Sequence, residues 1–196
     1  MGSYVPLFFS LFSLSYCHGI KGILPRDTLS HFCVVTSWGS FNTTLSQYSA
    51  LLGQPAPTPG VAGGAGSNGT YVVNGVPQKL IGTTLIAFMQ LNNSTRMEFL
   101  AGDEGPSWWR DVYAAKGFEI HHQGYALPKG VAVWPVVEAA ASAGIGPPVQ
   151  WGRWGDINRP GSGCYVYVDS QKTLGVTVEI LGGSEGECDG LPAPPA

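Results

Sequence analysis

Four apolar segments of this chain each carry titratable side chains near their centre, and they constrain the fold more than any other feature. They are 29–35 with His31, 97–100 with Glu98, 119–125 with His121 and His122, and 175–181 with Glu179. Such a side chain on an apolar strand is costly unless it is paired or bound to a metal. The order histidine, glutamate, histidine, glutamate indicates a duplicated unit, with the longer loop in the first copy.

Turn residues and apolar periodicity predict the same order of elements, β-α-β-β-β, in both copies. A helix over 106–116 is expected to join the copies, and residues 54–69 form a Pro/Gly-rich loop. The elements expected in the first copy are a strand at 29–36, a helix at 42–52, and strands at 71–73, 80–91 and 95–100. Those expected in the second copy are a strand at 118–126, a helix at 131–143, and strands at 149–154, 164–168 and 176–181.

The chain resembles the vicinal oxygen chelate superfamily, the group of glyoxalase and methylmalonyl-CoA epimerase. The resemblance rests, in this order, on LSHFCVV, LIAFMQLNNSTRMEFLAG, GPSWWRDVYAAKGFEIHHQGYAL and GVTVEIL. It implies an α+β, glyoxalase-like fold in which paired βαβββ modules form a cup-like mixed β-sheet around one metal. The domain is expected over 24–182, with modules at about 24–103 and 117–182. Residues 1–23 are then an apolar extension or a signal peptide, and 183–196 a disordered tail.

The resemblance also implies a set of metal ligands. They are His31, Glu98, His122 and Glu179. Strand alternation supports this choice and places His121 on the opposite side of its strand. Two imidazoles and two carboxylates suit Zn, Ni, Co, Fe or Mn rather than Ca.

Such a site favours removal of a proton next to a carbonyl group. A divalent metal stabilises the resulting oxyanion, and Glu179 or Glu98 takes and returns the proton. We expect a metal-dependent isomerase or lyase that acts on a small carbonyl compound through an enolate-like intermediate. Residues 54–97 contain no Asp or Glu, so the second acid of a two-base epimerase is missing. A specialised substrate, such as a secondary metabolite, is therefore favoured over that of the classical epimerase.

Two alternatives remain from the sequence. A metal-free relative could sequester a ligand, as bleomycin-resistance proteins do, although it would not need four intact ligands. A ring-cleaving dioxygenase of this superfamily typically uses two histidines and one glutamate as metal ligands. The additional carboxylate of Glu98 disfavours this alternative.

Candidate substrate-binding residues come from the second copy. Arg153 could hold a carboxylate, Trp154 could pack on an apolar substrate, and Tyr165 shares a strand face with Tyr167. Surface or core packing is the alternative for each. With 12% charged residues and a net charge of −3, the chain has no basic surface for nucleic acid. The partners expected are a small-molecule substrate and, as a homodimer, a second copy.

The N-terminal region leaves the location open. The apolar run Tyr4 to Tyr16 has signal-peptide length and is too short to span a bilayer, and the first 20 residues contain no Lys or Arg. Sequons at Asn42, Asn68, Asn92 and Asn93 permit secretion, but a cytoplasmic location is slightly favoured. No C-x-x-C pair exists, so neither a zinc ribbon nor a redox motif is indicated, and Cys33 is expected to be a core thiol.

Overall fold

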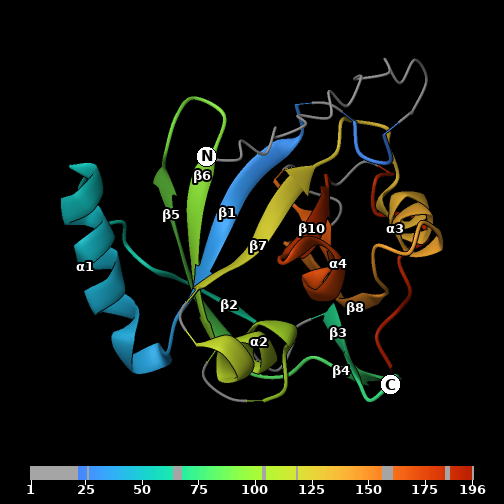
Figure 1. Ribbon diagram of the computed structural model, residues 1–196, viewed down its shortest axis with the longest axis horizontal. Helices are drawn as coiled ribbons and strands as arrows, with labels where there is room; N and C mark the ends of the chain where they lie inside the picture. Colours follow the sequence, from blue (N-terminus) through green and yellow to red (C-terminus); the bar gives the residue numbers. More distant parts are fainter. Residues whose placement is uncertain are drawn as a thin grey trace, which may run out of the picture.

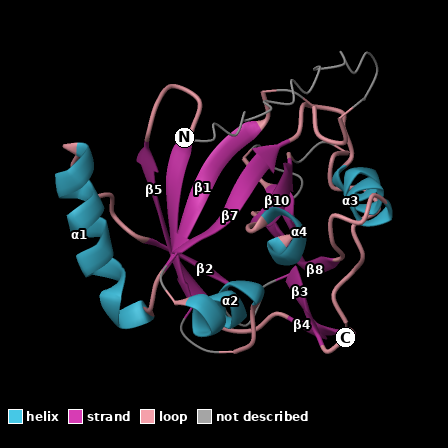
Figure 2. Cartoon of the chain, in the orientation of Figure 1, coloured by secondary structure: helices cyan, strands magenta, loops and turns pink. Residues whose placement is uncertain are grey.

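A computed structural model describes residues 22–25, 27–63, 68–102, 105–117, 119–155, 161–183 and 186–195. In these residues the strands form one strongly curled sheet, with α1 and α3 on its two flanks (Figure 1; Figure 2). The predicted run from Tyr4 to Tyr16, Cys17 and His18 lie outside the described residues. No helix in the described ranges is long and apolar enough to cross a membrane.

The two predicted modules are both present and are joined edge to edge. The first comprises β1 (Leu29–Val35), α1 (Phe41–Leu52), β2 (Gly60–Gly63), β5 (Thr83–Gln90) and β6 (Arg96–Gly102). The second comprises β7 (Glu119–Ala126), α3 (Val133–Ser142), β8 (Pro148–Trp154), β9 (Gly163–Val168) and β10 (Thr177–Gly182). The strand order is β2-β5-β6-β1-β7-β10-β9-β8-β3-β4. First and last strands of each module pair in parallel, while β1 and β7 pair antiparallel. The predicted α+β cup of paired βαβββ modules is therefore confirmed.

The region between β2 and β5 differs from the prediction. The segment expected as the second strand of the first module belongs to a hairpin of β3 (Asn68–Val73) and β4 (Val76–Lys79). Asn74 and Gly75 form its turn with φ of 51° and 79°, as expected for a tight hairpin. However, β3 pairs with β8 of the second module. The second strand of the first module is instead β2, inside the predicted loop, where small residues give no apolar alternation.

Helices α1 and α3 cover the outer face of the sheet. Phe41 and Leu45 of α1 pack on Val34 and Phe99, and burying each large apolar side chain contributes about 1.5–3 kcal/mol. On the other flank, α3 packs its buried valines against β9 and β10. Pro135 lies in the first turn of α3, where no backbone donor is lost. The bridging helix α2 (Trp108–Lys116) begins after Ser107, whose hydroxyl accepts from the Arg110 amide. Two further short helices are η1 (Trp38–Ser40) and α4 (Gln171–Leu174).

The prediction of a disordered tail over 183–196 is wrong for residues 186–195. A disulfide joins Cys188 to Cys164 of β9, and both Glu187 and Cys188 are 2% exposed. The Glu187 carbonyl accepts a hydrogen bond of 2.7 Å from the amide of Val133. The polar composition of the tail suggested disorder. The prediction failed because the disulfide depends on a contact with β9, which is distant in the sequence. Cys33 is free and buried, as predicted.

Candidate metal centre

The four predicted ligands come from four adjacent strands at the middle of the sheet. Pairing across β6, β1 and β7 aligns Glu98, Cys33 and His122 in one row. Pairing across β1, β7 and β10 aligns His31, Gly124 and Glu179 in the next. His31 and Cys33 are two residues apart, so both rows lie on the same face of the strand. The sheet thus gathers two histidines and two glutamates at one place on its concave side.

Ligand atoms of these residues converge closely. His31 Nε2 lies 3.1 Å from His122 Nε2, 3.3 Å from Glu98 Oε2 and 2.8 Å from Glu179 Oε2. His122 Nε2 lies 3.0 Å from Glu98 Oε2 and 3.3 Å from Glu179 Oε2. All four residues are buried, with exposures from 0% to 6%. The predicted convergence on one point is present, although bond lengths to an ion stay a prediction.

Gly124 makes this convergence sterically possible. A Cβ atom at this position would lie 2.1 Å from His31 Cε1 and 2.4 Å from its Nε2. The imidazole of His31 therefore lies directly over the backbone of β7, in space that only glycine leaves open. Gly124 is not among the residues predicted for the site. The sequence feature that could have indicated its role is a glycine two positions after His122, on the same face of the strand.

The expectation that His121 points to the opposite side is wrong. Cys33 pairs with His122, but the next residue of β1, Val34, pairs with Ile120. His121 is therefore the extra residue of a β-bulge, which interrupts the alternation of faces. Its imidazole is fully buried, and its Nδ1 lies 2.9 Å from Nδ1 of His122.

Burial and charge act in opposite directions on the ionisable groups of the centre. Burial lowers the pKa of His31, but hydrogen bonding and charge from Glu179 and Glu98 outweigh it and raise that pKa to about 10. The pKa of His122 is raised in the same way, mainly by Glu179. Burial raises the pKa of both carboxyl groups, yet their histidine neighbours lower it below the ordinary value. Glu98 and Glu179 are therefore ionised, and their negative charge attracts a proton on the histidines or another cation.

The residues fit a divalent cation. Glu179 Oε2 is buried and lies 2.8 Å from His31 Nε2 and 3.3 Å from His122 Nε2, and a buried carboxylate is costly unless a proton donor or a cation pairs with it. Two buried carboxylates near each other also repel unless a positive charge lies between them. Ligands at about 2.1 Å from an ion and at right angles to each other lie about 3.0 Å apart, close to the separations here. His31, Glu98, His122 and Glu179 together offer one such set of donor atoms.

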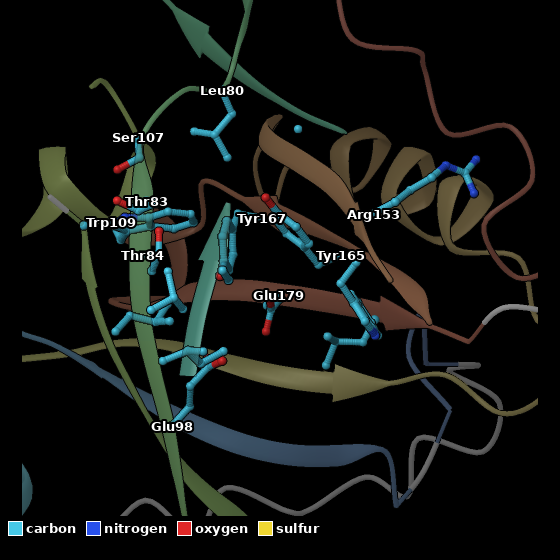
Figure 3. Close-up of a pocket in the computed structure, with 18 of the residues that line it drawn as sticks. Leu80, Thr83, Thr84, Glu98, Ser107, Trp109, Arg153, Tyr165, Tyr167 and Glu179 are labelled. Atoms are coloured by element: carbon cyan, nitrogen blue, oxygen red, sulfur yellow. The ribbon is translucent and has the colours of Figure 1, made fainter. Parts of the chain in front are cut away.

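A cavity of about 820 Å³ opens above His31, Glu98 and Glu179. In Figure 3 the side chains of Glu98 and Glu179 extend into the same space below Tyr165 and Tyr167. The aromatic and aliphatic residues of its wall include Val61, Leu80, Ile81, Ile86, Phe88, Leu100, Trp109, Trp154, Tyr165, Tyr167 and Leu181. The hairpin β3–β4 and the segment that follows it thus help to build the wall of the cavity.

The three predicted substrate-binding residues all border this cavity, in different ways. Arg153 turns its guanidinium away from the cavity and donates from Nη2 to the Cys188 carbonyl at 2.9 Å (Figure 3). Trp154 is 38% exposed, and its Nε1 donates to the Gly161 carbonyl. The ring of Tyr165 lies 5.3 Å from that of Tyr167. Trp109, which the sequence analysis did not select, also lines the cavity because α2 folds over the cup.

Neither a protein-family profile nor a curated protein sequence matches the chain. Among solved structures, it is similar to a mutant of 4-hydroxymandelate synthase from Streptomyces coelicolor, with a TM-score of 0.52 and 14% identity. This match covers 87% of the chain but 52% of the synthase, so the chain spans about half the length of that protein. The methylmalonyl-CoA epimerase of Mycobacterium tuberculosis matches with a TM-score of 0.46, 12% identity, and coverage of 79% of the chain and 87% of the epimerase.

Similarity at this level of identity shows the fold and not the activity. The synthase belongs to the superfamily that the sequence motifs resemble. Three features of the chain agree with that expectation: the paired modules, the parallel pairing of the first and last strand of each module, and the convergence of one histidine and one glutamate from each. The chain has the fold of the vicinal oxygen chelate superfamily.

Proposed function

We propose that this protein is a metal-dependent isomerase or lyase that acts on a small carbonyl compound through an enolate-like intermediate. The observation that carries the proposal is the buried pair of histidines and pair of glutamates at the base of a cavity. His31, Glu98, His122 and Glu179 would hold the cation. When bound, it would stabilise negative charge on a carbonyl oxygen of the substrate.

Glu179 is the better candidate for the base. Both glutamates line the cavity, and Glu179 extends into it below Tyr165 and Tyr167 (Figure 3). Its Oε2, 2.8 Å from His31 Nε2, would release the cation to act as the base. A carboxylate oxygen at the cavity floor can take a proton from the substrate carbon and return it to the same or a neighbouring atom. Glu98 is the alternative base if it releases the cation. His31 and His122 would orient the two carboxylates.

The carboxylates of the cavity support a one-base reaction. Within its described lining, Glu98 and Glu179 are the only acidic residues. Asp111 on α2 instead accepts the hydroxyl hydrogen bond of Tyr71. A two-base epimerisation needs a second acid on the other side of the substrate carbon, and the described lining supplies none. This supports proton transfer on one face of the substrate.

The walls of the cavity favour a largely apolar substrate without a strong negative charge. Of the two arginines in the described lining, Arg153 binds the tail carbonyl and Arg96 lies 4.7 Å from the ring centroid of Phe88. Tyr165 and Tyr167 supply aromatic surface above the glutamates (Figure 3). A flat or aliphatic group could pack there while its carbonyl oxygen reaches the cation.

Solvent exchange tests the proposal directly. The metal-loaded protein is incubated in D₂O with a panel of apolar ketones, hydroxyketones and thioesters, and loss of the α-proton is followed by NMR. Exchange or isomerisation should require metal, stop with chelator, and fall by about 100-fold or more in Glu179→Gln. Glu138→Gln on the exposed side of α3 is the matched control. Proton exchange that persists in Glu179→Gln but stops in Glu98→Gln would reverse the roles of the two glutamates.

The same experiment separates the alternative functions. Oxygen uptake with Fe²⁺ that parallels substrate loss would favour the dioxygenase. Tight binding of a ligand that chelator leaves unchanged, with no turnover, would favour the metal-free sequestering protein.

A further inference from the structure

His121 is a buried histidine beside a metal ligand, and the proposed reaction does not use it. The bulge in β7 places its ring against the far side of His122, with ring centroids 5.2 Å apart and planes at 86°. The two Nδ1 atoms are 2.9 Å apart. On its other side, His122 turns Nε2 toward Glu98 and His31. His122 is therefore held at both ring nitrogens.

The contact between the two Nδ1 atoms restricts where protons can lie. A hydrogen bond between two imidazole nitrogens needs one proton between them. If His122 binds a cation through Nε2, that atom must present its lone pair, and the neutral ring then carries its proton on Nδ1. His122 Nδ1 is then the donor and His121 Nδ1 the acceptor. The reverse arrangement would put a proton on His122 Nε2 and block the cation.

The far nitrogen of His121 is consistent with this direction. With Nδ1 as acceptor, the neutral ring of His121 carries its proton on Nε2. That atom is buried, and the backbone of Trp108 offers the ring a hydrogen-bond acceptor.

The surroundings of His121 prevent its ring from turning away. The ring is 0% exposed and lies 5.9 Å from the ring of Tyr167 at 86°. The backbone carbonyl of His121 accepts a hydrogen bond from Gln171 Nε2, which also donates to Thr177 Oγ1 at 2.9 Å. Trp108 Nε1 donates to the same Thr177 oxygen at 2.8 Å. Contacts from α2, α4 and β10 thus fix the bulge that brings the two histidines together.

We infer that His121 is a positioning residue: its Nδ1 accepts the Nδ1–H of His122 and so directs the Nε2 lone pair of His122 toward the cation. The inference rests on the proposed metal centre and goes beyond it, because His121 itself touches neither cation nor substrate. Ligating histidines commonly donate their second N–H to a carboxylate or carbonyl oxygen. In this chain a second histidine takes that place.

Zinc affinity of the purified metal-free protein, measured by competition with a chromophoric chelator, tests the inference. His121→Leu removes the acceptor and should weaken zinc binding by about 10–100-fold. His121→Asn places a carbonyl oxygen at the δ1 position, which can accept from His122, and should restore most of the affinity. Val168→Ala, which shortens a buried side chain of β9 outside the centre, should lower thermal stability but leave zinc affinity unchanged.

Histidine ¹⁵N spectra of the zinc-loaded protein give a readout that packing would not move. His122 should carry its proton on Nδ1 and bind through Nε2 in the wild type and in His121→Asn. Wild-type zinc affinity in His121→Leu, or equal losses in His121→Asn and His121→Leu, would overturn the inference while leaving the metal centre intact. Full zinc binding by His122→Ala would overturn the metal centre itself, and the role of His121 with it.

Discussion

The steric dependence of the centre on Gly124 gives a sharp prediction for Gly124→Ala. A carbon–carbon contact needs about 3.5 Å, and the added Cβ would start 2.1 Å from His31 Cε1. The imidazole must therefore move by more than about 1 Å, whereas a metal ligand tolerates about 0.2 Å. We expect His31 to be lost as a ligand, and zinc affinity to fall by about 100-fold or more, beyond the effect of losing an outer partner.

Stability should fall in the same variant, because overpacking a buried site costs about 1–3 kcal/mol. Chemical denaturation of the metal-free protein measures the change in the free energy of unfolding, and competition with a chelator measures zinc affinity. Gly60→Ala is the matched control, because its added Cβ would meet Ile86 Cγ2 at an ordinary 3.5 Å. It should change neither zinc affinity nor stability appreciably.

A double-mutant cycle identifies the clash as the cause. In a His31→Ala background, the ring that meets the new Cβ is absent, so Gly124→Ala should cost much less stability than in the wild type. The coupling should be on the order of 0.5–3 kcal/mol. Wild-type zinc affinity and stability in Gly124→Ala, or no coupling to His31, would show that the ring does not lie over β7.

Two further predictions follow from charge and from the disulfide. The pKa of His31 in the metal-free protein is raised from 6.5 to about 10, so its proton stabilises the fold fully below pH 6.5 and that contribution is lost as pH rises toward 10. Zinc must displace the same proton, so its affinity should rise by up to about tenfold per pH unit in this window; a flat profile would contradict the assignment. Reduction of Cys164–Cys188, which are 24 residues apart, should lower the free energy of unfolding by about 3 kcal/mol. Cys188→Ala should show a similar loss and no response to reductant, whereas no change on reduction would show that the tail contributes little.

Local patterns in the sequence were sufficient for the two modules, and the resemblance to the superfamily supplied the four residues that converge in the centre. Glu179 lies on a regular central strand, and the pairing of β1 with β6 is regular at His31, so alternation reports the face of both residues correctly. His121 was misplaced because a bulge adds one residue to the strand and leaves no period-two signal. The turn at Asn74 and Gly75 is also a local feature, because both residues adopt the positive φ of a tight hairpin turn.

The remaining errors concern contacts between segments that are distant in the chain. Turn residues specify that β3 and β4 form a hairpin, but not that β3 pairs with β8. The same reason applies to the tail, which Cys188 fixes to β9. Gly124 belongs to this class as well, because its importance depends on a ring from β1 lying over it.

The topology separates the part of the cup that carries the proposed metal ligands from the part that can vary with substrate. Parallel pairing within each module and antiparallel pairing between β1 and β7 place the ligand-bearing strands side by side. Any sequence with this pairing brings the two ligand rows to the same face. The chain between β2 and β5, in contrast, leaves one edge of the sheet, forms a hairpin at the other edge and returns. Because Leu80 and Ile81 at the end of this excursion line the cavity, changes there can reshape the substrate space while the strands that hold the metal ligands stay in place.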